Sequence, residues 1–155
     1  FLNLIFTNTR AGNNNLLPQY QRAVEKSRIA EGYSMLGTLK QALETYILSN
    51  GTGEIDTDTI ALHIDMSHFP LVSDGTNDKF YASKHFLYEI YCGKFNNCYI
   101  NAFRYQKADY SDLREHYALA LTRLPSACWY TQCYYKDSFG LSICKTLPDV
   151  TLHSW

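Results

Sequence analysis

Apolar residues recur every three or four positions through the second half of a long segment, Leu16 to Gly51. This spacing places them on one face of an α-helix. The stripe consists of Ile29, Tyr33, Leu36, Leu39, Leu43, Tyr46 and Ile47. Pro18 suits the first turn of such a helix, and Asn50 with Gly51 is typical of its end. The pattern predicts a helix over residues 16–50, about 50 Å long at 1.5 Å per residue.

The front half of this helix lacks the apolar stripe. The run from Gln21 to Arg28 mixes charges of both signs, a pattern that usually marks a solvated helix face. Its charged members are Arg22, Glu25, Lys26 and Arg28. We therefore expect the first half of the helix to project from the globular body. Its contacts would then lie elsewhere, in other copies of the chain or in a membrane, and in a filament the charged run would contact neighbouring subunits.

The remainder of the chain predicts an antiparallel sheet. Residues 51–84 indicate a variable loop, in which the segment TDTIALHI fits either a short helix or a strand. Two later runs are rich in aromatic and β-branched residues and predict strands, and two further runs after them are expected to continue the sheet. They extend from His85 to Cys92, Cys98 to Tyr105, Arg114 to Leu124 and Ala127 to Tyr135, and residues 136–155 form a C-terminal region. The fold class is therefore α+β.

The packing of helix on sheet follows from the same periodicities. Alternate residues of the third strand, Tyr117, Leu119 and Leu121, share one face. We expect them to pack against the apolar stripe of the helix, chiefly against Leu36, Leu39 and Leu43. Residues 16–155 are then a single domain.

Five cysteines predict two disulfides. Cys92 and Cys98 face each other where a hairpin closes, and facing strand positions bring Cβ atoms within disulfide reach. Cys144 would tie the segment after the last strand back to Cys133, and the odd count leaves Cys128 over, unless one pair is assigned wrongly. The chain has no CxxC motif and no zinc-finger spacing. A disulfide-bonded domain suits a secreted or cell-surface protein.

Composition narrows the classes of function. A chain of 155 residues is expected to form one domain. Its formal net charge of −1 gives no basic excess to neutralise phosphates, so no nucleic-acid partner is expected. Its 13 tyrosines are unusual, and tyrosine-rich chains often have half-exposed sheet faces or packing surfaces between subunits.

The helix resembles a known family. The stretch LPQYQRAVEKSRIAEGYSMLGTLKQALETYILSNG is similar to the segment that follows the membrane-spanning part of bacterial type IV pilins and type II secretion pseudopilins. The matching residues are Pro18, Tyr20, Ala23, Val24, Glu25, Lys26, Ser27, Arg28, Ala30, Glu31, Tyr46, Asn50 and Gly51. The stretch from Cys133 to Leu147 also resembles the cysteine-closed end of many such subunits. The similarity covers residues 16–147, strongly in the helix and weakly elsewhere.

This resemblance implies a pilin fold, with a long N-terminal helix packed on a four-stranded antiparallel sheet and a disulfide-closed C-terminal region. It implies a structural subunit of an extracellular type IV pilus-like filament, a fimbrium of the bacterial surface that serves cell adhesion. The alternative within the family is a periplasmic pseudopilin of a type II secretion system. The implied partners are other copies of the chain, other pilins or pseudopilins, and the inner membrane with its assembly machinery. No enzymatic activity and no cofactor are expected.

The first fifteen residues depart from the family's pattern. Phe1 matches the residue that the family methylates, but Ile5 stands where the family has a glutamate, and no long apolar run follows. In the family, that glutamate neutralises a neighbour's N-terminal amine in hydrocarbon, where an unpaired charge is costly. Residues 1–15 therefore read as an atypical N-terminal segment, too short and too interrupted to span a bilayer.

By the same resemblance, subunits pack through the projecting half of the helix. The residues expected at this contact are Tyr20, Ala23, Val24 and Ser27. Positions 23 and 27 are one turn apart, and their small side chains would let a neighbouring helix approach closely. A third hypothesis, outside the family, is a secreted, disulfide-stabilised binding module.

Other candidate sites have weaker support in the sequence. The histidines are scattered without metal-ligand spacing, so no metal site is expected from His63, His68, His85, His116 and His153. Cys128 with the upstream His116 imitates a nucleophile pair, but a structural or free cysteine is favoured. The run Asp56-Thr57-Asp58 is a fragment of a calcium loop without its other ligands, which favours a polar loop. No phosphate loop or dinucleotide motif occurs, and no catalytic residue is expected.

Overall fold

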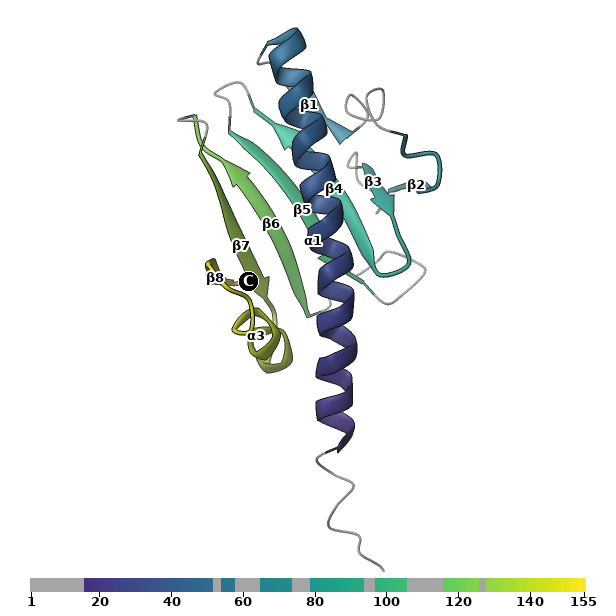
Figure 1. Cartoon of the computed structure of the whole chain (residues 1–155), viewed down its shortest axis with the longest axis vertical. Coiled ribbons are helices and arrows are strands. Elements are labelled where there is room, and N and C mark those ends of the chain that lie inside the picture. Colours follow the sequence, from purple (N-terminus) through teal and green to yellow (C-terminus); the bar gives the residue numbers. More distant parts are fainter. Residues whose placement is uncertain are drawn as a thin grey trace, which may run out of the picture.

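A computed structural model of the chain describes residues 16–51, 54–57, 65–73, 79–93, 97–105, 116–125 and 128–155. Within these residues a long helix lies across one face of a twisted sheet, and a short helix lies near one end of it (Figure 1). The helices are α1 (Leu16–Asn50) and α3 (Ser138–Cys144). The strands are β1 (Ile55–Asp56), β2 (Leu71–Ser73), β3 (Lys79–Ala82), β4 (Phe86–Cys92), β5 (Cys98–Arg104), β6 (Tyr117–Arg123), β7 (Trp129–Tyr135) and β8 (Val150–Ser154).

The strands form one eight-stranded sheet in the order β2-β3-β4-β5-β6-β7-β8, with β1 paired to β4. Strands β1 and β3 both pair with the edge of β4 that β5 does not use. Every pair is antiparallel except β7 with β8. Parallel neighbours need a crossover, and here the chain makes it through α3.

The expected four-stranded sheet of a pilin fold is therefore wrong. The four predicted strands are present as β4 to β7, but the sheet has eight strands. Three of the additional strands lie in residues 51–84, which the sequence indicated as a loop, and the fourth lies in the C-terminal region. Strands β1 and β2 have only two and three residues, which is too short for an alternating pattern of buried and exposed positions. Strand β8 is mostly exposed, so its sequence also lacks this pattern. The segment TDTIALHI, after its first residue, lies outside the described residues.

The core lies between α1 and the inner face of the sheet. Leu36, Leu39 and Leu43 are fully buried, as are Tyr117 and Leu119 on β6. Leu121, the third predicted partner, is half-buried at the margin of the same cluster. The predicted face of the helix is thus confirmed.

The helix lies close to the sheet at Gly32. A Cβ atom placed on this residue would come within 3.2 Å of side-chain atoms of Phe86 and Leu119. This contact is tighter than ordinary packing, so glycine allows α1 to lie close against β4 and β6.

Both predicted disulfides are present. Cys92–Cys98 joins registered partners at the end of the β4–β5 hairpin, and Cys133–Cys144 ties α3 to β7. Cys128 is exposed and is not disulfide-bonded. Because the enclosed loops are short, each bond is expected to contribute roughly 2–3 kcal/mol by constraining the unfolded chain.

We expect Leu39→Ala to lower the free energy of unfolding by about 2–5 kcal/mol, because it leaves a cavity under a fully buried position. Denaturant melts measure this change. Gln41→Ala, on the exposed side of the same helix, is the matched control and should shift the free energy by no more than about 0.5 kcal/mol. Equal stabilities of the two variants would contradict the assignment of Leu39 to the core.

Candidate functional site

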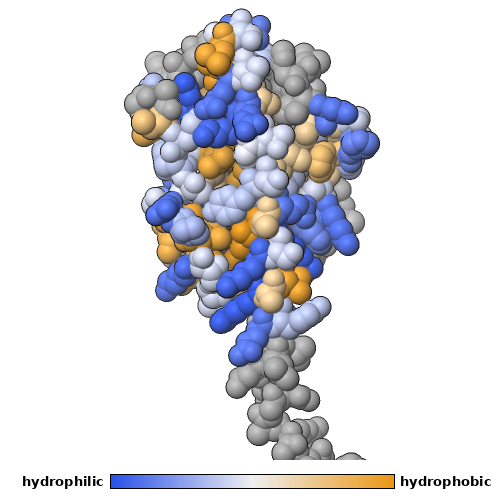
Figure 2. All heavy atoms as spheres, viewed as in Figure 1, coloured by the Kyte–Doolittle hydropathy of each residue, from blue (hydrophilic) through white to orange (hydrophobic). Residues whose placement is uncertain are grey.

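The first turns of α1 extend beyond the sheet (Figure 1). Residues 19–23 are exposed, with Tyr20 at 69% of its full accessible surface, and Val24 is half-buried. The next residue, Glu25, is only 5% exposed. Figure 2 shows hydrophilic residues over these turns and hydrophobic residues beside the helix, on the side where α3 lies. The boundary between the packed and the projecting parts of the helix therefore falls at Glu25.

Glu25 is held by a fork of hydrogen bonds from Arg104 on β5. Arg104 donates from Nε to Oε2 and from Nη2 to Oε1, both at 3.1 Å. Tyr117 Oη on β6 donates to Oε2 at 3.0 Å, and Arg28, one turn further along α1, pairs with Oε1. The carboxylate is thus bonded from both neighbouring strands and from its own helix. Such two-pronged pairs are the strongest and most directional of protein hydrogen bonds.

The remaining donors of Arg104 are satisfied by backbone carbonyls. Its Nη1 donates to His85 O at 3.2 Å and also to Tyr105 O. Arg104 is 2% exposed, so an unmet donor here would be costly. Because both ions are buried, loss of one partner would leave the other charge without compensation, at a cost of about 3–5 kcal/mol.

The network shifts the pKa values of its members in opposite directions. Burial alone would raise the pKa of Glu25, but hydrogen bonds and the charge of Arg104, with help from Arg28 and Tyr117, hold it below its ordinary value of 4.5. Burial raises the pKa of Tyr117, and the adjacent negative charge of Glu25 raises it further. Glu25 is therefore an anion and Tyr117 a neutral donor at neutral pH.

The expectation that Glu25 belongs to a solvated helix face is therefore wrong, although Arg22 and Lys26 are exposed. A signal was present in the sequence. Glu25 continues the apolar stripe one turn ahead of Ile29, and Arg104 follows Ile100 and Ala102 at the inward positions of β5. Two opposite charges at inward positions of two elements that pack together indicate a buried pair.

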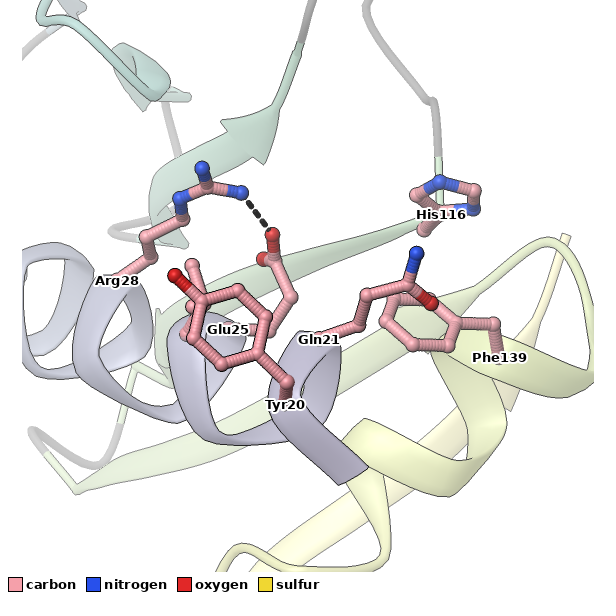
Figure 3. A pocket seen from close by; sticks show the side chains of 7 residues that line it. Tyr20, Gln21, Glu25, Arg28, His116 and Phe139 are labelled. Carbon is pink, nitrogen blue, oxygen red and sulfur yellow. Dashed lines mark hydrogen bonds and ion pairs between the residues drawn. The ribbon is translucent and has the colours of Figure 1, made fainter. Parts of the chain in front are cut away.

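A groove with a volume of about 540 Å³ lies beside this network. In Figure 3 the side chains of Tyr20, Gln21 and Arg28 on α1 lie on one side of it, and those of His116 and Phe139 lie on the other. Val24 and Glu25 complete the lining. The groove therefore joins the projecting turns of α1 to the end of β6 and to α3.

The far wall of the groove is fixed by Asp137. Its Oδ2 lies 2.7 Å from His116 Nδ1, and its Oδ1 accepts a hydrogen bond of 2.7 Å from Gly140 N at the start of α3. Burial opposes ionisation of this carboxyl, but the Gly140 amide and His116 outweigh it and lower its pKa. Phe139 packs edge-on against the His116 ring at 5.1 Å. At Gly140 a Cβ atom would meet His116 O at 1.9 Å, so only glycine fits there.

The expected packing residues fall on two adjoining faces of α1. Tyr20 and Val24 line the groove, whereas Ala23 and Ser27 are exposed outside it. The sequence did not indicate His116, Asp137 or Phe139 as neighbours of these residues. Phe1, the expected methylation site, and Ile5 lie outside the described residues.

The fold does not support the other candidate sites that were considered from the sequence. Cys128 and His116 lie at opposite ends of the β6–β7 hairpin, so they do not form a nucleophile pair. The Thr57 hydroxyl donates to Ile90 O and accepts from Ile90 N, which gives it a structural role, and Asp58 lies outside the described residues. Across the described ranges, no three potential metal-binding side chains lie together, and His63 falls in a gap between these ranges.

No protein-family model, curated protein or solved structure matches the chain. The resemblance to pilins and pseudopilins therefore rests on the residues of α1 and of the C-terminal cysteine segment alone. Among the described helices, none is both long and apolar enough to cross a membrane.

We expect Glu25→Gln to lower the free energy of unfolding at pH 7 by about 3–5 kcal/mol, because Arg104 loses its counter-charge in a buried site. The pKa of Glu25 is lowered by folding, so its charge stabilises the fold above pH 4.5 and this contribution is lost as the pH falls through the folded-state pKa. The difference between wild type and variant should therefore shrink in acid. Denaturant melts across this pH range measure it.

Glu54→Gln is the matched control, because Glu54 is exposed and the same chemical change there should shift the free energy by no more than about 0.5 kcal/mol. A constant difference between wild type and Glu25→Gln from pH 7 into acid would contradict a role for the charge of Glu25.

Proposed function

We propose that this protein is a structural subunit of an extracellular filament of the type IV pilus kind, and that subunits pack through the first turns of α1. A pseudopilin of a type II secretion system would use the same contact in a shorter filament. The proposal includes other copies of the chain, and related subunits, as partners. It does not involve an enzymatic reaction.

The observation that carries the proposal is the projecting start of α1. Tyr20, Ala23 and Ser27 are exposed there, whereas the same helix is firmly packed from Glu25 and Ile29 onward. A monomeric domain gains nothing from helical turns that extend past its own core, since tertiary packing supplies most helical stability. These turns are stabilised if a neighbouring subunit covers them.

The chemistry of the projecting turns suits a helix from a neighbour. Ala23 and Ser27 are small and lie one turn apart on the outward face, so another backbone can approach closely. Tyr20 beside them offers a large ring with a polar tip, a side chain that is enriched at interfaces. A contact between this face and a different face of the next copy does not close, so it propagates into a filament.

The proposal rests on α1 and not on the sheet, because the eight-stranded sheet departs from the four-stranded sheet that the resemblance implied. The two disulfides agree with a non-reducing compartment such as the periplasm or the cell surface. Methylation of Phe1, and contact with the inner membrane and the assembly machinery before polymerisation, are further parts of the proposal.

A second candidate function is a secreted binding module. It is favoured by the sheet face turned away from α1, where Tyr91, Tyr99 and Tyr130 are 45%, 39% and 36% exposed. These residues alternate with inward-facing neighbours such as Ile90 and Ile100. Exposed aromatic rings on a rigid sheet provide contact area at a low entropic cost.

The test is Ala23→Trp in the native subunit, with incorporation into filaments followed by electron microscopy. Position 23 is exposed, so the melting temperature should stay that of the wild type. The bulky ring should block close approach of a neighbouring helix and abolish incorporation. Ser49→Trp is the matched control at the opposite, exposed end of α1 and should assemble normally.

Normal filaments of the Ala23→Trp subunit would overturn the proposed packing surface and would favour the binding module. Loss of assembly in both variants would contradict a packing surface confined to the first turns of α1, because Ser49 lies at the other end of the helix.

A further inference from the structure

The groove at the start of α1 offers hydrogen-bond donors that the chain itself does not use. Arg28 and His116 lie on opposite sides of it (Figure 3). The half-buried Arg28 pairs with Glu25 through Nη1, and its Nε and Nη2 have no partner within the described residues. A guanidinium has five N–H donors in a fixed fork, so most of the donors of Arg28 stay available to a ligand.

The carboxylate of Glu25 has no acceptor left for a ligand. Its oxygens accept two hydrogen bonds from Arg104 and one each from Tyr117 and Arg28, which fills its lone-pair sites. Because two arginines share this one carboxylate, the α1 wall of the groove carries a surplus of positive charge. The pKa of His85, whose backbone O accepts from Arg104, agrees: burial lowers it, and the charge of Arg28 lowers it further.

The opposite wall also presents a donor. Asp137 is an anion at neutral pH, and an ionised carboxylate only accepts, so His116 donates to it from Nδ1. In its protonated form His116 then offers Nε2–H to a second carboxylate. Asp137 does not line the groove, and its other oxygen accepts from Gly140 N. The groove therefore has open donors on both walls, while the carboxylates beside it are already bonded.

The rest of the lining suits a peptide better than a small ion. Val24, Phe139 and the ring of Tyr20 supply apolar surface that an inorganic anion would not cover. The exposed Gln21 carries an amide that can both donate to and accept from a peptide group. The groove volume of about 540 Å³ is in the range of ligand pockets and has room for whole side chains.

We propose that this groove binds an acidic peptide segment of a partner protein, with a carboxylate of the peptide on Arg28 and an apolar side chain of the peptide against Val24 and Phe139. A guanidinium and a carboxylate match in shape and charge, and such pairs form the strongest hydrogen bonds in proteins. The inference goes beyond the proposed filament, because it names the chemistry that the groove recognises and holds whether or not the partner is another copy of the chain.

NMR titration of the folded chain with a blocked tripeptide, a glutamate between two leucines, tests the site directly. Saturable shifts are expected at the amides of Gln21, Val24, Arg28, His116 and Phe139, with millimolar affinity. The matched control is the same tripeptide with glutamine in place of glutamate, which should bind roughly tenfold more weakly because it lacks the charge. Absence of saturable shifts at these residues, or equal affinity for the two peptides, would overturn the proposal.

Acetate tests whether the apolar part of the groove contributes. It carries the carboxylate without the leucine side chains, so it should bind at least about tenfold more weakly than the glutamate tripeptide. If acetate saturates the same shifts at the same concentration, the groove is a simple anion site and the peptide part of the proposal is wrong.

Two variants of Arg28 test its role. Arg28→Gln should weaken binding of the glutamate tripeptide about tenfold, and it should fold, because Glu25 keeps its bonds from Arg104 and Tyr117. Arg28→Lys keeps the charge but not the planar fork, so it should weaken binding roughly threefold, and it serves as the test if Arg28→Gln does not fold. Arg22→Gln, exposed on the same helix and outside the groove, is the matched control and should bind like the wild type. Unchanged binding by the Arg28 variants would overturn the proposal.

Ala23→Trp separates this inference from the filament. Ala23 is exposed outside the groove, so the variant should bind the glutamate tripeptide as the wild type does. If the wild type does not bind the tripeptide while Ala23→Trp still blocks incorporation into filaments, the inference is wrong and the filament proposal stands. If the tripeptide binds while Ala23→Trp subunits form normal filaments, the proposed packing surface is wrong and the inference stands.

Discussion

The ion pair between Glu25 and Arg104 is the constraint on which the placement of α1 depends. The other buried side chains of this helix are apolar, and apolar contacts are not directional. Glu31 and Glu44 accept hydrogen bonds from Ser83 and Trp129, but these contacts are only partly buried. A buried carboxylate is more restrictive than an apolar side chain, because it must meet hydrogen-bond donors in a fixed geometry. Arg104 on β5 and Tyr117 on β6 supply those donors at one place on the sheet. The pair therefore fixes both the rotation of α1 and its position along the strands.

The division of α1 into a packed and a projecting part follows from this constraint. Glu25 is the first buried residue among residues 19–50 of the helix, and the turns before it extend past the strands (Figure 1). The groove lies at the same junction, between those turns and α3. The Cys133–Cys144 bond and the Asp137 contacts with His116 and Gly140 hold α3 in place, so the far wall of the groove is fixed independently of the helix.

Much of the fold is accessible from the sequence where periodicity extends over many residues. The stripe of α1 predicted the helix and its buried face. The aromatic and β-branched runs of β4 and β5, with the shared face of Tyr117, Leu119 and Leu121 on β6, indicated the central strands. Cys92 and Cys98 were predicted as a pair because a hairpin brings them together. The edge strands were missed since β1 and β2 have only two and three residues, and since β8 pairs in parallel with β7 after a crossover. Such pairing depends on contacts that a local pattern does not contain.

Only part of the groove could be predicted from the sequence, because its two walls come from distant parts of the chain. Tyr20 and Val24 were predicted at the projecting turns, and both line the groove. His116 and Phe139 lie across the groove from them. Their positions depend on the register of the β6–β7 hairpin and on the placement of α3 after β7. Glu25 and Arg104 are 79 residues apart in the chain, so their pairing can be inferred from the sequence only if an inward-facing charge is recognised on each element.

The central claim is that the packing of α1 in the isolated subunit begins at Glu25. Amide hydrogen exchange along the helix tests this most directly, because exchange reports local opening residue by residue. We expect the amides of residues 20–24 to exchange fast and those from Ile29 onward to be strongly protected, with the change within one turn of Glu25. Uniform protection from residue 20, or protection that begins only at Leu36, would contradict the account.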